Sequence, residues 1–229
     1  MQVDQNKDKT GYILMGPKHM VEEVRERIKE NPVKCGDWEV KEMEQEKWLG
    51  DWFTNGLQES VMATIKHRAP KIRRALFEIV NIVKDYRAQR VGGFMTGLIM
   101  WESCCIPSLI YNSGCWMGMT RKEEDALSEC QDFFLRLLLG TGPGAPKVAL
   151  RADSRTCSMP MRVKKEKVMM VKHVRELEHD SLARQIYEEQ VKNGWPGLAQ
   201  ETEQICKELY VENVNETKKS KYEYQKEMK

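Results

Sequence analysis

The stretch from Ile72 to Tyr86, I-R-R-A-L-F-E-I-V-N-I-V-K-D-Y, has the clearest helical pattern in this chain of 229 residues. Its apolar residues are spaced by four, three, four and three positions, at Ile72, Leu76, Ile79, Val83 and Tyr86. Such spacing places one apolar stripe along an α-helix. The stretch therefore predicts an amphipathic helix that buries this stripe in a helical core.

The same period extends on both sides of this helix. Leu57, Val61 and Ile65 predict a preceding helix, which we expect to be interrupted near Pro70 because proline removes a helical hydrogen bond. Thr96 is a candidate cap for the next helix, which we expect to end near Pro107. Thr120 and Glu123 have the spacing of a capping box at the start of a long helix.

The C-terminal third predicts three more helices, at about 160–178, 181–192 and 197–213, and a disordered tail over 215–229. The fold class that we expect is therefore mainly α. Residues 1–56 differ, because they predict one helix from His19 to Lys29 among short strands. These strands are too few to close a sheet. We expect the missing strands to come from another part of a longer protein, or this region to be unstable alone.

Residues 47–56, K-W-L-G-D-W-F-T-N-G, form an aromatic, hairpin-like element at the junction between these two regions. Asn55-Gly56 favours a tight turn with positive φ. Trp48, Trp52 and Phe53 are candidates to wedge this element against the following helices. They can equally be a hydrophobic anchor without any other role.

Two basic blocks underlie a formal net charge of only +2. Residues 66–90 contain eight Lys or Arg against two acids, and residues 147–175 contain nine against two. Blocks of this sign suit polyanionic partners, and they can also be solvated helix faces.

Several protein classes are disfavoured by the sequence. No apolar run approaches the roughly 20 residues of a membrane span. The polar start and the seven cysteines without a CxxC pair predict an intracellular chain, in the nucleus or the cytoplasm, with reduced thiols. The four histidines lack zinc-finger spacing. No nucleophile or metalloprotease motif is present, and the glycine-rich stretch 140–146 lacks the Gly-Lys-Ser/Thr ending of a phosphate loop.

Three segments together resemble the reverse transcriptases of non-LTR (LINE-type) retrotransposons. They are K-W-L-G at 47–50, R-A-P-K-I-R-R-A at 68–75, and W-E-S-C-C-I-P-S-L-I-Y-N-S-G-C-W at 101–116. The resemblance covers roughly residues 5–190, with Trp48 at a position where tyrosine is commoner. It implies a partial polymerase palm with a primer-grip-like hairpin over 1–56 and a thumb-like helical bundle over 57–146. A basic, then acidic, helical C-terminal region follows over 147–214.

The catalytic motif of that family, Tyr/Phe-x-Asp-Asp, is absent, because the chain contains no Asp-Asp pair. That motif supplies carboxylates for the metal ions of phosphoryl transfer. The resemblance therefore implies a non-catalytic fragment without a cofactor of its own. RNA-directed DNA polymerase activity, with Mg²⁺, is expected only together with a catalytic half upstream.

The resemblance also gives the basic residues a role, namely to bind the backbone phosphates of an RNA–DNA or RNA primer–template. The first group of candidates is Lys47, Trp48, Lys66, Arg68, Lys71, Arg73 and Arg74. The last five would lie at a helix start, where the helix dipole attracts phosphate. The second group is Arg162, Lys164, Lys165, Lys167 and Lys172. The alternative function is a helical module that binds a protein partner through exposed Trp and Met side chains, without nucleic acid.

Overall fold

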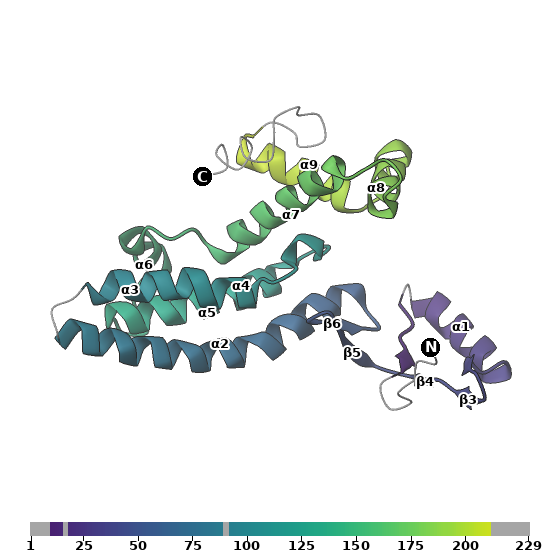
Figure 1. The fold of residues 1–229 in the computed structure, drawn as a ribbon, viewed down its shortest axis with the longest axis horizontal. Helices are drawn as coiled ribbons and strands as arrows, with labels where there is room; N and C mark the ends of the chain where they lie inside the picture. Colours follow the sequence, from purple (N-terminus) through teal and green to yellow (C-terminus); the bar gives the residue numbers. More distant parts are fainter. Residues whose placement is uncertain (1–9, 16–17, 89–91, 212–229) are drawn as a thin grey trace. The chain divides into compact units, whose positions relative to one another are not determined.

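The computed structural model describes residues 10–15, 18–88 and 92–211. It is mainly helical, as the sequence predicts, and Figure 1 shows the elements in chain order. The chain divides into two compact units, Met1–His67 and Arg68–Lys229. The sequence placed borders at 56/57 and 146/147 instead. The tail predicted over 215–229 lies outside the described residues.

The first unit contains one helix, α1, and three two-stranded sheets. Strands β1 and β4 pair in parallel, whereas β2 pairs with β3 and β5 with β6 in antiparallel fashion. Each short sheet leaves strand edges open, so this unit has no continuous sheet in its described part. The bounds are β1 Gly11–Tyr12, α1 Lys18–Glu30, β2 Lys34–Cys35, β3 Trp38–Glu39, β4 Lys41–Glu42, β5 Gln45–Trp48 and β6 Asp51–Thr54.

The β5–β6 hairpin turns at Leu49-Gly50, because Trp48 pairs directly with Asp51. Both turn residues have positive φ, 48° and 94°, as a two-residue type I′ turn requires. The predicted turn with positive φ at Asn55-Gly56 is wrong. Those residues precede helix α2 (Leu57–Ala88), and the Gly56 carbonyl accepts from the amides of Glu59 and Ser60 at the start of that helix.

Helix α2 is continuous over thirty-two residues and contains Pro70, so the predicted interruption there is wrong. Proline leaves the carbonyl four residues earlier, on Lys66, without its helical donor. Lys66 and Pro70 are both exposed, so water can satisfy that carbonyl. The predicted stripe is buried from Ile72 to Val83, and this burial favours a continuous helix. Its last member, the Tyr86 side chain, lies outside the described residues.

In the second unit, helices α3 and α5 and the part of α2 that begins at Arg68 form a helical layer (Figure 1). A Cβ on Gly97 of α3 would lie 2.5 Å from Leu138 Cδ1 and 3.1 Å from Val83 Cγ2, so the three helices approach closely there. The bounds are α3 Gly93–Met100, the π-helix η2 Trp101–Cys105, α4 Ile106–Leu109, the 3₁₀-helix η3 Ser113–Cys115, α5 Arg121–Leu139, α6 Lys147–Ser154, α7 Met159–Glu176, α8 Leu182–Asn193 and α9 Leu198–Leu209.

Helix starts were predicted with mixed success. Thr120 and Glu123 form the predicted capping box of α5, with the Thr120 amide 2.5 Å from Glu123 Oε2. Thr96 is not a cap, because α3 begins earlier with Gly92 as its N-cap residue. The helical path also passes Pro107 and ends at Leu109, since Pro107 lies in the first turn of α4, where its missing N–H matters little.

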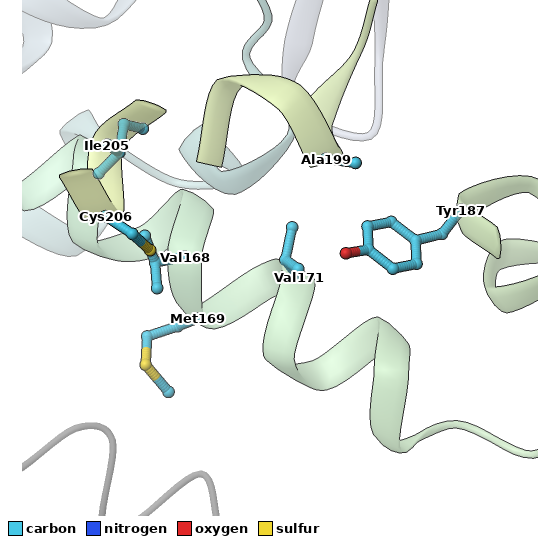
Figure 2. Packing of buried hydrophobic residues seen from close by; sticks show 7 residues of the cluster. All are labelled: Val168, Met169, Val171, Tyr187, Ala199, Ile205 and Cys206. Carbon is cyan, nitrogen blue, oxygen red and sulfur yellow. The ribbon is translucent and has the colours of Figure 1, made fainter. Parts of the chain in front are cut away.

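The residue ranges of helices α7, α8 and α9 lie close to those of the three C-terminal helices that the sequence predicts. They share an apolar cluster that contains Val168 and Val171 of α7, Tyr187 of α8 and Ile205 of α9 (Figure 2). Helix α7 also packs against η3 and α5. The sequence missed α6, whose buried Leu150 follows the glycine-rich stretch at 140–146.

Candidate nucleic-acid interface

The β5–β6 hairpin is anchored on the first turns of α2 by polar and aromatic contacts. The Trp52 amide donates to Thr64 Oγ1 at 2.8 Å, and the Thr54 amide donates to Ser60 Oγ at 3.0 Å. The Trp52 ring stacks on His67, with ring centroids 3.8 Å apart. Trp52 is therefore the residue that joins the hairpin to the helix.

Trp48 and Lys47 of β5 are both exposed to solvent, and Lys47 lies directly opposite Trp52 in the hairpin. Trp48 is 65% exposed and meets the edge of Phe53 at a centroid distance of 6.1 Å. Lys47 is exposed and makes no ion pair with any residue that the structure describes. Lys66 of α2, in the same unit, is also exposed and has no acidic partner in the described part of the chain. These side chains are available to a ligand.

Lys71 and Arg74 are the corresponding free cations of the second unit. Both are exposed on α2, and neither forms an ion pair within the described ranges. Arg73 is also exposed, and its guanidinium lies 5.9 Å from the centre of the Phe133 ring. Phe77, 53% exposed, meets the same ring edge-on at 5.7 Å. The sequence analysis did not single out Phe77 and Phe133. Phe77 lies off the apolar stripe of α2, a position that predicts an exposed side chain.

Arg68 differs from its neighbours, because it binds the chain itself. Its Nη1 donates to the carbonyl oxygens of Tyr111 at 2.8 Å and Leu109 at 3.3 Å. Its guanidinium also lies 5.7 Å from the ring centres of Tyr111 and Trp116. Arg68 thus holds the segment between α4 and α5 in place.

The cluster on α2 lies in the middle of a long helix and not at its start, as was expected from the supposed break at Pro70. The helix dipole acts only within the first and last turns. Any attraction of this cluster for phosphate therefore comes from the side-chain charges alone.

Three of the six Lys and Arg residues of α7 pair with acids within the fold. Arg162 pairs with Glu102, Lys164 Nζ lies 2.7 Å from Glu208 Oε2, and Lys167 pairs with Glu201. Lys167 is only 2% exposed and Lys172 is also buried, whereas Lys165 is half-buried. The Lys164 ammonium, by its hydrogen bond, holds the pKa of Glu208 below its usual range. The sequence could not reveal these pairs, because the acids lie 34 to 60 residues from their partners.

Two buried cysteines, Cys105 and Cys130, are poor candidates for a nucleophile. Burial raises the pKa of the Cys105 thiol to about 11, and burial also raises the pKa of Cys130. Both thiols therefore stay protonated at neutral pH. In the described part of the chain, no three His, Cys, Asp or Glu residues gather in a way that could hold a metal ion.

The described helices include none with the length and apolar character needed to cross a membrane. No protein-family model, no curated protein and no solved structure matches this chain. The exposed cations and aromatic rings described above are therefore the features that indicate a function.

Proposed function

We propose that this chain binds the backbone phosphates of an RNA–DNA or RNA primer–template duplex, as the primer-grip and thumb part of a retrotransposon reverse transcriptase. The observation that supports this proposal is the contrast between the two basic blocks. Lys66, Lys71 and Arg74 of α2 are exposed and form no ion pair within the described residues, whereas the cations of α7 are mostly paired or buried.

Each unit contributes its own contacts. Lys47 and Lys66 of the first unit, and Lys71 and Arg74 of the second, are the proposed phosphate ligands. Arg73, which was also expected to bind phosphate, already contacts the Phe133 ring and the Cys130 thiol. Trp48 offers an exposed ring, on the face of β5 opposite to Lys47, on which a base can stack. Arg68 and the α7 residues Arg162, Lys164 and Lys167 are assigned to the fold instead, because their charged groups already have partners.

The proposal gives the chain no chemistry of its own. The family's metal ions need a group of carboxylates, and the sequence lacks the Asp-Asp pair that supplies them in the catalytic motif. Mg²⁺-dependent nucleotide addition would belong to a catalytic half on another part of a longer protein. The chain alone is expected to add no nucleotides to a primer.

A salt series tests the proposal. Fluorescence anisotropy with a labelled RNA–DNA duplex should show affinity that falls steeply with ionic strength, because each phosphate contact releases counterions. Lys71→Gln with Arg74→Gln should weaken binding and reduce the salt slope by about 0.9 per lost contact. Arg121→Gln with Lys122→Gln removes the same charge from exposed positions on α5 and is the matched control. An equal loss in both double variants would contradict a site on α2.

A second candidate function, protein binding without nucleic acid, is favoured by one surface of the second unit. Leu182 and Ile186 lie one turn apart on α8 and are exposed, as is Trp195 after that helix. A partner bound there through apolar contacts would show little dependence on salt. Binding that ignores ionic strength, together with no affinity for the duplex, would support this second function.

A further inference from the structure

A cavity of about 320 Å³ lies within the second unit, between helix α7 and the segment that follows α4. Its volume is at the lower end of the roughly 300–1,000 Å³ that small-molecule sites occupy. The residues that line it include Tyr111, Ser113, Glu166, Met170 and His173. None of them is among the residues expected to bind phosphate.

The walls of this cavity are set by the fold. The Ser113 amide donates to the Ile110 carbonyl at 2.9 Å, and Asn112 has the left-handed φ of 60° that this tight path requires. A Cβ on Gly114 would lie 2.9 Å from Met170 Cβ, so glycine allows the segment to lie directly against α7. The Arg68 guanidinium donates to the carbonyl oxygen of Tyr111 and so holds that residue in place. The site is therefore largely formed before any ligand binds.

Two polar groups at the cavity have unused hydrogen-bonding capacity. Glu166 is exposed, and its carboxylate has no cationic partner among the described side chains. Ser113 is 1% exposed, and its buried Oγ has no hydrogen-bond partner in the part of the chain that the structure describes. A buried hydroxyl without a partner is costly, but this Oγ is closed to solvent, so Glu166 is the polar group that a ligand can reach. Met170 is a flexible side chain that can shift to admit one.

The charges around the cavity favour a neutral ligand that carries donors. The carboxylate of Glu166 only accepts hydrogen bonds. The Arg68 guanidinium lies 5.7 Å from the centre of the Tyr111 ring, so a cationic ligand stacked on that ring would meet a like charge. Tyr111 is 57% exposed, and its ring offers a surface on which a flat heterocycle can stack.

Guanine is the nucleobase that combines these properties. Its N1–H and N2–H₂ groups lie side by side and can both donate to one carboxylate, whereas adenine and cytosine place one amino donor next to an acceptor. We propose that this cavity binds an unstacked guanine base, with Glu166 accepting from its Watson–Crick edge and Tyr111 stacking on its face. That the base belongs to single-stranded RNA rests on the function proposed above; the pocket itself does not.

Free nucleosides test the pocket, because they carry no phosphate for the α2 cations. Titration of the full chain, followed by NMR, should show that guanosine binds about tenfold or more tightly than inosine, which lacks the 2-amino group, and than adenosine. Glu166→Gln should remove this preference. Glu176→Gln, an exposed change on the same helix, should retain it. The melting temperature of both variants should match that of the unsubstituted chain.

Three outcomes would overturn the pocket. They are equal affinity for all nucleosides, no difference between the two glutamate variants, and tighter, Glu166-dependent binding of the cation agmatine than of guanosine. The two proposals fail separately. Salt-dependent duplex binding without guanosine binding removes only the pocket, and guanosine binding without duplex binding removes only the phosphate interface.

Discussion

Leu49 occupies a backbone conformation that leucine disfavours. It is the first residue of the β5–β6 turn, with φ of 48°, and its side chain is 69% exposed. A left-handed conformation costs a residue with a bulky side chain about 1–2 kcal/mol, and asparagine tolerates it better. Because the side chain packs little, no burial offsets this cost.

Leu49→Asn should therefore stabilise the first unit by about 1 kcal/mol. Urea unfolding followed by tryptophan fluorescence measures the change, since Trp48 and Trp52 flank the turn. Leu49→Ala is the control, because alanine retains a Cβ and should gain little. A lower urea midpoint for the asparagine variant would show that the leucine side chain stabilises the hairpin through contacts.

At the scale of the element, Pro70 is the exception to the pattern of α2. The apolar stripe on both sides of it is continuous and buried, so the helix forms despite the lost hydrogen bond. Proline inside a helix costs about 3 kcal/mol relative to alanine. Local rules predicted a break, and packing of the stripe overrode them.

Pro70→Ala should raise the free energy of unfolding by about 1–3 kcal/mol, because it restores the bond to the Lys66 carbonyl. Chemical denaturation followed by circular dichroism is the measurement. Pro160→Ala provides a matched control, since Pro160 lies in the first turn of α7 after an extended N-cap residue and its change restores little. Equal gains in the two variants would argue against the stated mechanism.

Helix α1 is joined to β4 by an ion pair that should respond to pH. Arg25 donates to Glu42 at 2.5–3.2 Å, and this hydrogen bond holds the pKa of Glu42 below its usual value of 4.5. A carboxyl with a lowered folded-state pKa contributes stability above its unfolded pKa. That contribution is lost as the pH falls through the lower, folded-state pKa.

The urea midpoint of the chain should consequently fall as the pH drops below about 4.5, the window in which Glu42 becomes protonated. The effect should be modest, because Arg25 is more than a third exposed and solvent screens the pair. Glu42→Gln should flatten this part of the pH profile. Glu23→Gln, which breaks an exposed pair within α1, serves as the control. Identical profiles for Glu42→Gln and the unsubstituted chain would disprove the assignment.

For the whole molecule, the two basic blocks look alike in sequence and differ in the fold. Lys167 is buried against Glu201, whose Oε2 is itself buried and has no hydrogen-bond partner in the described residues. The Glu201 side chain is 26% exposed, so the loss of its cation would leave a partly desolvated charge, which costs more than the intact pair contributes. The α7 block should therefore affect stability rather than ligand affinity.

Lys167→Met should destabilise the second unit by about 2–4 kcal/mol, because Glu201 loses its partner. Adding Glu201→Leu should recover most of that loss, since an apolar pair has no unmet charge. Thermal unfolding measures both changes. Duplex affinity of the folded double variant should equal that of the unsubstituted chain, in contrast with the Lys71 and Arg74 changes. A lower duplex affinity of this double variant would indicate that α7 residues also contact the duplex.

Local patterns in the sequence determined the helical fold class, the buried stripe of α2, the Thr120–Glu123 cap and the three C-terminal helices. These features depend on side chains within a few residues of one another, so a single sequence contains them. Only the tertiary structure decided which cations are free, where the hairpin turns and that Pro70 remains within a helix. The free cations depend on acids 34 to 60 residues away, and the continuity of α2 depends on the burial of distant apolar surfaces. The hairpin is held by contacts of Trp52 and Thr54 with α2, and no local pattern reports any of these interactions.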